Sequence, residues 1–247
     1  MRIPLTLLRR RPAPAPETAA PTPPPSPFER ARGVRVDLPT RALYQAISLL
    51  LDYPGEELVA RIPLLRATLE QSEADGVSSA ARVRPLLDRL ETTALAELQS
   101  DYVETFDMRR RCCLHLTYYA FGDTRRRGMA LLDLKQAYLA SGVDLSDAEL
   151  PDHLCVLLEF TASVEPAVGR VLLQDNRPGI ELLRLSLADR GSPYAAAVEA
   201  LTGTFPAIGG SDAQAVRALV AQGPPDEEVG MEAFMSGSSA SQVGARS

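Results

Sequence analysis

The stretch DYVETFDMRRRCCLHLTYYAFGDTRRRG, residues 101–128, holds most of the side chains of this chain that could do chemistry. Two arginine triplets, 109–111 and 125–127, flank two adjacent cysteines, a histidine and several aromatic residues. Neither helical periodicity nor a turn at Gly122-Asp123 requires that composition. Polar and aromatic side chains beyond what a fold needs are typical of a binding surface. We therefore expect a binding surface here.

The cysteines and histidines are ligands of the kind that zinc takes. Cys112, Cys113 and His115 lie close together, and His153 and Cys155 follow in a later segment. Adjacent cysteines project in different directions, however, and neither group has the usual spacing of a zinc site. Buried cysteines are also common for plain packing reasons. We expect no bound metal.

Cys112 is also a candidate nucleophile, because the neighbouring arginines would lower its pKa and raise its thiolate fraction. His115 is placed to act as a base. No third orienting group and no glycine turn that could stabilise an oxyanion is evident near them. The sequence therefore predicts a protein that is not an enzyme.

Phosphate-binding motifs are the next possibility. The chain has no GxxxxGK[ST] and no GxGxxG after a strand. The arginine triplets could bind phosphate, although arginine runs are more often solvated or paired with acids, here Glu104, Asp107 and Asp123. A helical maturation factor that binds metal or nucleotide through the Cys/His or Arg clusters stays as the alternative interpretation.

A second informative segment has the sequence LSDAELPDHLCVLLEF. Ser146 is a good helix cap, and Glu149 three residues later completes a capping box. Pro151 suits the first turn of a helix that opens at Asp152-His153. On residue chemistry alone this segment is a helix start, with acids at the positive end of the helix dipole.

The elements that position these segments are predicted to be helices. Apolar residues recur at helical spacing from Leu43, after a cap at Pro39-Thr40, and again from Leu58 to Leu69, where Pro63 should kink or shorten the helix. Further helical patterns cover residues 87–106, 131–138, 154–158, 180–187, 194–201 and 213–220. No strand-length alternation and no fixed repeat is visible. The predicted fold is all-α, a single bundle-like domain.

The two ends of the chain differ from its middle. Residues 1–39 hold ten of the twenty prolines and almost no apolar periodicity, so we expect a disordered extension. Residues 223–247 end in SGSSASQVGARS and are expected to form a flexible tail. The helical domain is predicted to cover residues 40–222.

Charge restricts the class of partner. The chain has a net charge of −6, and residues 1–39 carry +4, which leaves −10 for the rest. An acidic body argues against nucleic acid, because phosphate binding needs a basic face. It suits a basic peptide or another protein.

Composition also bears on the compartment. No stretch approaches the roughly 20 apolar residues of a membrane span. The N-terminal arginines follow a short apolar run instead of preceding it, which is not the order of an export signal. Three cysteines make no disulfide framework and fit a reducing compartment. We expect a cytoplasmic protein.

Taken together, these segments resemble the NarJ family, the nitrate reductase molybdenum-cofactor assembly chaperones. The matching pieces, in order over residues 40–205, are SLLLDYP, YVETFD, RRRCCLHLTYY, GDTRRRG and ELPDHL followed by LEF. An acid–Pro–Asp–His element is the recurrent signature of the wider group of redox-enzyme maturation chaperones. Glu149, Pro151, Asp152 and His153 carry it here, with Leu150 inserted.

The resemblance implies an all-helical, cytoplasmic, non-catalytic chaperone with no cofactor of its own. Such proteins bind the apo catalytic subunit of the membrane-bound respiratory nitrate reductase and keep it competent for insertion of the molybdenum cofactor, before it docks to the membrane subunit. The implied ligand is the N-terminal segment of that subunit, bound as an amphipathic helix in a groove. Whether the chaperone forms a homodimer stays open.

The residues by themselves agree with a groove for a basic amphipathic helix. We expect it where residues 102–123 face the ELPDH segment, with aromatic side chains as its wall, Phe121 among them, and acids at its rim. Core packing is the alternative for each aromatic. The candidate peptide-binding residues are Tyr102, Glu104, Phe106, Asp107, Tyr118, Tyr119, Asp123, Glu149, Asp152 and His153.

Overall fold

A computed structural model describes residues 24–146, 149–207, 209–210, 213–214 and 217–218. Over these ranges the named elements are helices, and one isolated β-bridge joins His115 to His153. The prediction of an all-α fold is confirmed for the described residues. None of the helices in that part of the chain has both the length and the apolar character needed to cross a bilayer.

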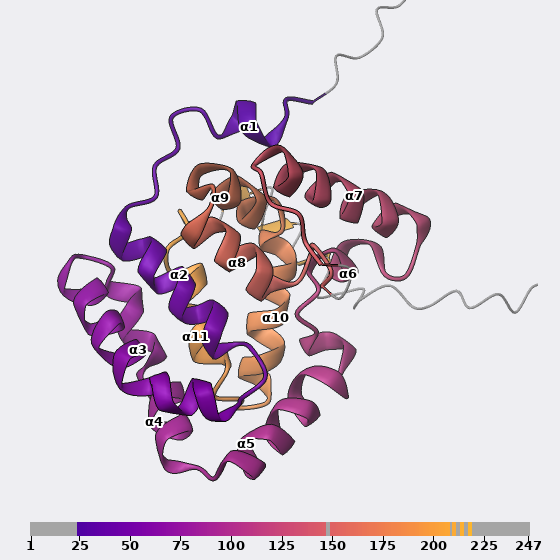
Figure 1. The fold of residues 1–247 in the computed structure, drawn as a ribbon. Helices are drawn as coiled ribbons and strands as arrows, with labels where there is room; N and C mark the ends of the chain where they lie inside the picture. The colour runs from indigo at the N-terminus through magenta and orange to yellow at the C-terminus, as the bar shows by residue number, and fades with distance from the viewer. Residues whose placement is uncertain (1–23, 147–148, 208, 211–212, 215–216, 219–247) are drawn as a thin grey trace, which may run out of the picture.

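Eleven α-helices follow one another in the described residues (Figure 1). Their bounds are α1 Pro27–Arg30, α2 Leu38–Leu50, α3 Glu56–Ala74, α4 Arg84–Thr92, α5 Leu95–Tyr102, α6 Leu116–Phe121, α7 Arg125–Ala140, α8 Leu154–Ser163, α9 Pro166–Asp175, α10 Arg177–Asp189 and α11 Ala195–Thr202. A π-type turn, Val103–Asp107, follows α5, and 3-10 turns cover Ser78–Val83 and Arg110–Cys112.

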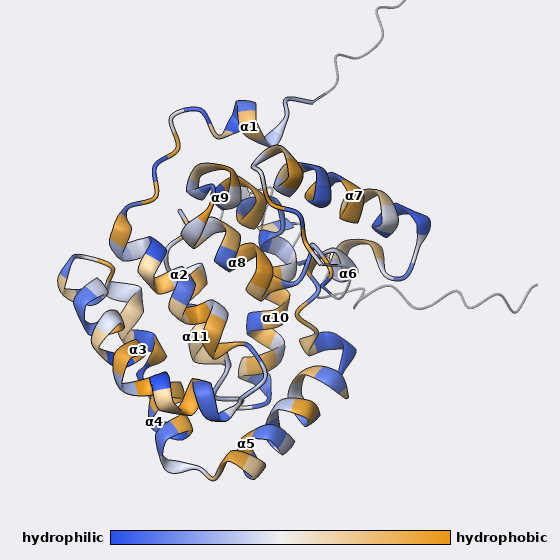
Figure 2. Ribbon diagram, in the orientation of Figure 1, coloured by the Kyte–Doolittle hydropathy of each residue, from blue (hydrophilic) through white to orange (hydrophobic). Residues whose placement is uncertain are grey.

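The core lies where α2 packs on α8 and α3, with α11 and α10 beside them (Figures 1 and 2). Leu43, Ile47 and Leu50 of α2 are fully buried, as their spacing of three and four residues predicts. On α8, Leu154 and Leu157 are also fully buried, because this helix runs through the middle of the domain. Helix α7 lies at the periphery, where it packs mainly on α6.

The start of the domain differs from the prediction of a disordered extension over residues 1–39. Residues 24–39 are described, and α1 packs on α9. Ser26 and Glu29 form a capping box that favours this short helix. Arg30 then forms two hydrogen bonds with Asp175, at 2.5 and 2.7 Å. The described structure therefore begins before the predicted boundary at residue 39. Residues 1–23 and the predicted tail 223–247 lie outside the described residues.

Two smaller predictions also need correction. Helix α2 begins at Leu38, because the side chain of Asp37 accepts a hydrogen bond from the Thr40 backbone N–H at 2.9 Å and caps the helix. Helix α3 continues for 19 residues through Pro63, so this proline does not shorten it. The predicted helix over 213–220 lies only partly within the described residues.

Candidate peptide-binding site

Asp152 is the centre of a buried polar cluster and is fully inaccessible to solvent. Its carboxylate accepts hydrogen bonds from the backbone N–H of Thr117 at 3.2 Å and from the Thr117 hydroxyl at 2.5 Å. The Nδ1 atom of His115 lies 3.3 Å from the other carboxylate oxygen. A buried carboxylate needs several such partners, because an unpaired charge in the interior is costly.

The backbone ties the same two segments together. The N–H of Leu116 donates to the Asp152 carbonyl at 3.0 Å, and the N–H of Leu154 donates to the Leu114 carbonyl at 2.8 Å. The first N–H of α8 is therefore occupied by the chain itself. The predicted contact between residues 102–123 and the ELPDH segment exists, but it is a closed junction.

The ELPDH segment is a turn that precedes α8. The helix begins at Leu154 with His153 as its N-cap, two residues later than predicted. Ser146 and Glu149 are joined by a backbone hydrogen bond of 3.2 Å, and neither lies within a helix. The capping box predicted for them is wrong. The carboxylate of Asp152 bonds to Thr117 and His115 instead of capping its own helix, which a local sequence pattern does not reveal.

Arg127 connects this cluster to the surface. Its side chain is 16% exposed and pairs with Asp123 at 2.7 Å, while a second guanidinium nitrogen lies 3.7 Å from Asp152. The guanidinium also lies over the Tyr118 ring. Arg109 pairs with Glu104 at 3.2 Å. One arginine of each triplet therefore pairs with an acid expected from the sequence, Arg109 with Glu104 and Arg127 with Asp123.

Burial and charge shift the pKa values of this cluster. Burial alone would raise the pKa of Asp152, but hydrogen bonds from His115 and Thr117 and the nearby charge of Arg127 outweigh it and hold that pKa below its usual value. For His153, burial lowers the pKa, and the neighbouring His115 lowers it further. At neutral pH we therefore assign a carboxylate at Asp152 and a neutral imidazole at His153.

The predicted aromatic wall is mostly core. Tyr102 and Phe106 pack against each other and against Tyr194, and the Tyr102 hydroxyl donates to the Leu51 carbonyl at 3.1 Å. Tyr119 is fully buried, with its hydroxyl 2.8 Å from the Cys113 carbonyl. These side chains therefore pack as the core alternative predicts.

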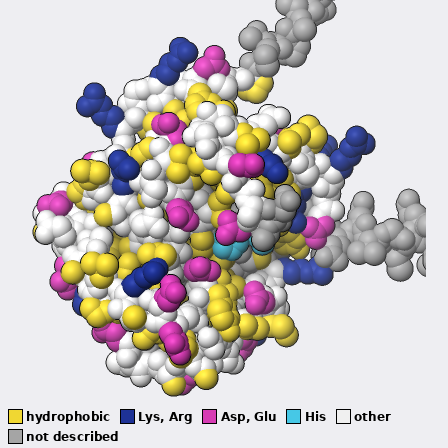
Figure 3. Space-filling model, in the orientation of Figure 1, with side chains coloured by type: hydrophobic (Ala, Val, Ile, Leu, Met, Phe, Trp, Pro, Cys, Tyr) yellow, Lys and Arg dark blue, Asp and Glu magenta, His cyan; other side chains and the backbone are white. Residues whose placement is uncertain are grey.

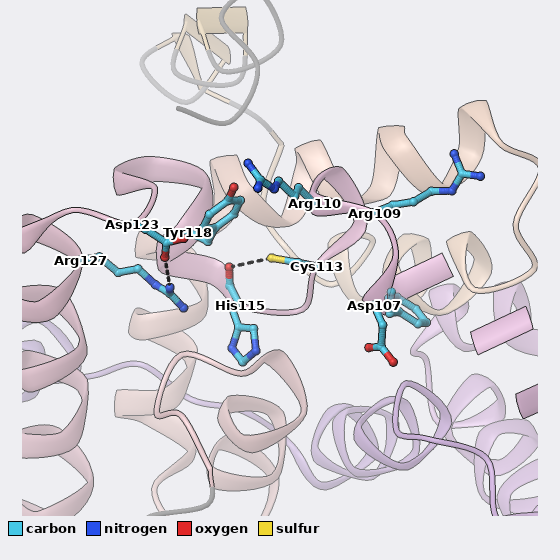
Figure 4. Close-up of a pocket in the computed structure, with 9 residues that line it drawn as sticks. Asp107, Arg109, Arg110, Cys113, His115, Tyr118, Asp123 and Arg127 are labelled. Carbon is cyan, nitrogen blue, oxygen red and sulfur yellow. Dashed lines mark hydrogen bonds and ion pairs between the residues drawn. The ribbon is translucent and has the colours of Figure 1, made fainter. Parts of the chain in front are cut away.

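A cavity of about 210 Å³ opens next to this cluster, and we call it the arginine-lined cavity (Figure 4). In Figure 4, Arg109 and Arg110 lie on one side, and Asp123 and Arg127 lie on the other. The Cys113 thiol donates to the His115 carbonyl at 3.6 Å between them. The cavity is lined by Phe106, Asp107, Arg109, Arg110, Cys113, His115, Tyr118, Asp123 and Arg127.

Four of the ten predicted site residues line this cavity: Phe106, Asp107, Tyr118 and Asp123. The other six lie elsewhere. Tyr102, Tyr119 and Asp152 are buried, His153 is half-buried in the junction, and Glu104 and Glu149 are exposed on the surface.

Sequence reasoning missed the parts played by Arg127, Thr117 and His115. Arg127 was visible only as one arginine among six, and nothing in the sequence singles out Thr117. His115 had been considered only as a metal ligand or a base.

The pKa values of Cys112 and Cys113 do not favour a nucleophilic thiolate. Burial raises the pKa of Cys112, and the nearby arginines Arg190 and Arg109 offset this only in part. Burial likewise raises the pKa of Cys113 to about 11. Arg109 does lower the Cys112 pKa, as expected, but burial outweighs it, so the predicted gain in thiolate fraction is not found. Among the described residues, no three His, Cys, Asp or Glu side chains are grouped to hold a metal ion.

Comparison with known proteins places this helical protein in a family. A sequence model of the family described as "Nitrate reductase delta subunit" matches residues 72–200. That match covers more than half of the chain and includes both the arginine-lined cavity and the ELPDH turn. The chain belongs to this family.

Similar curated proteins carry related names. One is the probable nitrate reductase molybdenum cofactor assembly chaperone NarJ of Bacillus subtilis (strain 168), 32% identical over 67% of this chain and 89% of that protein. Another is the nitrate reductase molybdenum cofactor assembly chaperone NarJ of Escherichia coli (strain K12), 32% identical over 60% of this chain and 63% of that protein. The predicted relationship to the NarJ assembly chaperones is confirmed.

A third relative is much longer than this chain. The nitrate reductase-like protein NarX of Mycobacterium tuberculosis (strain ATCC 25618 / H37Rv) is 37% identical over 68% of this chain, but the match spans only 25% of that protein. Among solved structures, a putative redox enzyme maturation protein from Archaeoglobus fulgidus aligns with a TM-score of 0.48 and 22% identity, over 68% of this chain and 93% of that one. That TM-score is too low to argue from.

Proposed function

We propose that this protein is a chaperone for the assembly of respiratory nitrate reductase. It binds the apo catalytic subunit through that subunit's N-terminal segment and supports insertion of the molybdenum cofactor before the subunit docks at the membrane. It works in the cytoplasm as a binding protein without catalysis. Membership of the delta-subunit family and the names of the Bacillus and Escherichia relatives support this proposal.

The observation that carries the site is the surface around the arginine-lined cavity. Glu104, Asp107 and Asp123 are exposed there, and Met108 is 74% exposed in the turn after the π-type segment. In the view of Figure 3, acidic and apolar side chains lie around the histidines. Such a surface supplies apolar contacts for one face of a peptide helix. Its acids can meet basic side chains of the peptide, although Glu104 and Asp123 would then exchange or share their present partners, Arg109 and Arg127.

The buried junction gives this surface a fixed shape. The hydrogen bonds of Asp152 hold residues 114–117 against the start of α8, and Arg127 extends the same network to Asp123 at the rim. Binding surfaces are more effective when they are ordered before the ligand arrives, because less entropy is lost on binding. In this proposal the ELPDH segment contributes to binding indirectly, because its buried hydrogen bonds hold the residues of the surface in place.

Isothermal titration tests the proposal, with the full chain and a synthetic peptide of the N-terminal segment of the nitrate reductase catalytic subunit. We expect binding that weakens with salt, because exposed acids meet basic residues. Asp107→Asn and Asp123→Asn should each weaken binding about 2- to 5-fold, the range of a single exposed ion pair. Met108→Ser should weaken it about tenfold as a lost apolar contact.

Matched controls lie on α3, on another part of the surface. Glu57→Gln removes an exposed acid, and Leu64→Ser removes a leucine that is 67% exposed. Both controls should leave the affinity unchanged. A peptide that does not bind the wild-type chain contradicts the proposed ligand. A peptide that binds Asp107→Asn, Asp123→Asn and Met108→Ser as tightly as it binds the wild type contradicts the proposed site.

A further inference from the structure

A second, larger cavity lies away from the arginine-lined cavity. It has a volume of about 770 Å³ and runs between α7 and α9, with α6 at its floor, and we call it the α7–α9 groove. Its volume is in the range of ligand-binding pockets. Leu134 and Ala137 of α7, Leu172 of α9 and Phe121 of α6 make much of its lining apolar.

Helix α7 presents one complete face to this groove. Ala130, Asp133, Leu134, Ala137 and Ala140 all line it, at the spacing of three and four residues that places side chains on one side of a helix. Within the described residues this helix packs mainly on α6. Leu134 and Ala137 are already buried by the rest of the domain, whereas Ala130 is half-buried and Asp133 and Ala140 are exposed, so the outer part of this face is open to a further partner.

The chain's own N-terminal segment already forms one wall of the groove. Residues 24–28 line it, and Arg30 fixes this segment to α9 through its paired hydrogen bonds with Asp175. Ala31, one residue further, is buried. The chain that precedes Pro24 therefore enters the described structure at the rim of the groove.

We propose that residues 3–11 of this same chain dock in the α7–α9 groove. Ile3, Leu5, Leu7 and Leu8 supply apolar side chains for its lining, and Arg9-Arg10-Arg11 follow them. The groove has an exposed acid, Asp133, on α7, whereas Asp175 on α9 already pairs with Arg30. Apolar and charged groups therefore match between the segment and the groove.

The tether makes this occupant favourable over one that arrives from solution. Residues 12–23 connect the segment to Pro24 and, fully extended, span about 40 Å at about 3.3 Å per residue. That length lets the segment fold back along the groove. A short tether gives an effective concentration in the millimolar range, so even weak intrinsic affinity keeps the groove covered.

Paramagnetic relaxation in the full-length chain tests this proposal. A nitroxide attached through Thr6→Cys, with the half-buried thiol removed by Cys113→Ala, should broaden the amide signals of α7 and of residues 172–176. Leu5→Ser/Leu7→Ser/Leu8→Ser should abolish the broadening, and Ala130→Gln, which fills the groove, should weaken it. Ala13→Ser/Ala15→Ser in the tether is the matched control and should leave it unchanged.

A mixture of spin-labelled chain and isotope-labelled chain without the nitroxide identifies the occupant. We expect no broadening in that mixture. Broadening there shows that the segment of a second copy fills the groove, which overturns the proposal. Broadening that is absent from α7, or that survives the triple serine variant, overturns it as well. None of these outcomes depends on peptide binding at the arginine-lined cavity.

Discussion

At the scale of single residues, the position of Asp152 in the structure differs most from the expectation. The sequence predicted an acid at the rim of a groove, and the structure buries it completely among Thr117, His115 and Arg127. Charge-assisted hydrogen bonds of this kind are stronger than neutral ones. An acid in the acid–Pro–Asp–His element can therefore serve a binding protein by fixing backbone geometry.

Asp152→Asn should destabilise the fold because it removes the charge that these donors share. A hydrogen bond to a charged group contributes about 1.5–3 kcal/mol, and we expect a loss of that size. Urea unfolding followed by circular dichroism measures it. Asp144→Asn, at an exposed acid before the ELPDH turn, is the control and should stay within about 0.5 kcal/mol of wild type. Equal stability of both variants would show that the Asp152 cluster is not stabilising.

The lowered pKa of His153 predicts how the stability of the fold depends on pH. Its pKa in the fold lies below the usual 6.5, because burial disfavours the charged ring. The unfolded chain therefore binds this proton more readily, so the His153 contribution is complete above about pH 6.5 and decreases as pH falls below it. In His153→Gln the loss of stability between pH 7.5 and 5.5 should be smaller than in wild type. Urea midpoints at the two pH values test this, and an unchanged difference contradicts it.

At the scale of elements, helical periodicity predicted most of the domain. The patterns that start at Leu43, Leu58 and Leu131 correspond to α2, α3 and α7, because burial of one face imposes a visible spacing on the sequence. Helices α1, α6 and α9 were not predicted. The turn before α8 was predicted as a helix start, because its hydrogen-bond partners lie 35 to 37 residues earlier in the chain.

The contact between α8 and α9 depends on a residue without a side chain. A methyl group on Gly169 would lie 2.7 Å from the Cα atom of Thr161, and backbone cannot move aside as a flexible side chain can. Gly169→Ala should therefore cost about 1–3 kcal/mol through overpacking. Gly128→Ala on α7, where the space is open, is the matched control and should stabilise by about 0.5–1 kcal/mol. Thermal melts that move in the same direction for both variants would contradict this packing.

At the scale of the whole molecule, composition restricts the class of partner but does not indicate where that partner binds. The acidic body and the all-helical pattern agree with a receptor for a basic peptide, and both are properties of the whole chain. The exact surface depends on which aromatics enter the core. Tyr102 and Tyr119 have the same residue type as an exposed anchor, and only tertiary contacts distinguish the two roles.

The N-terminal extension is a second case in which composition does not reveal a tertiary contact. Proline content indicated disorder over residues 1–39, but α1, which has a capping box and an ion pair to Asp175, packs on α9. The ion pair is partly exposed, and such pairs contribute only up to about 1 kcal/mol. Its importance for the molecule is the position that it gives to Pro24, at the rim of the α7–α9 groove.

The most direct test of the central claim is the molybdenum content of the nitrate reductase catalytic subunit, purified from cells that lack their own assembly chaperone. With this chain co-expressed, the subunit should contain about the molybdenum of the wild-type enzyme. Without it, or with the Asp107→Asn/Asp123→Asn/Met108→Ser variant, the content should be low at equal subunit yield. Equal molybdenum content with and without the chain would contradict a role in cofactor insertion.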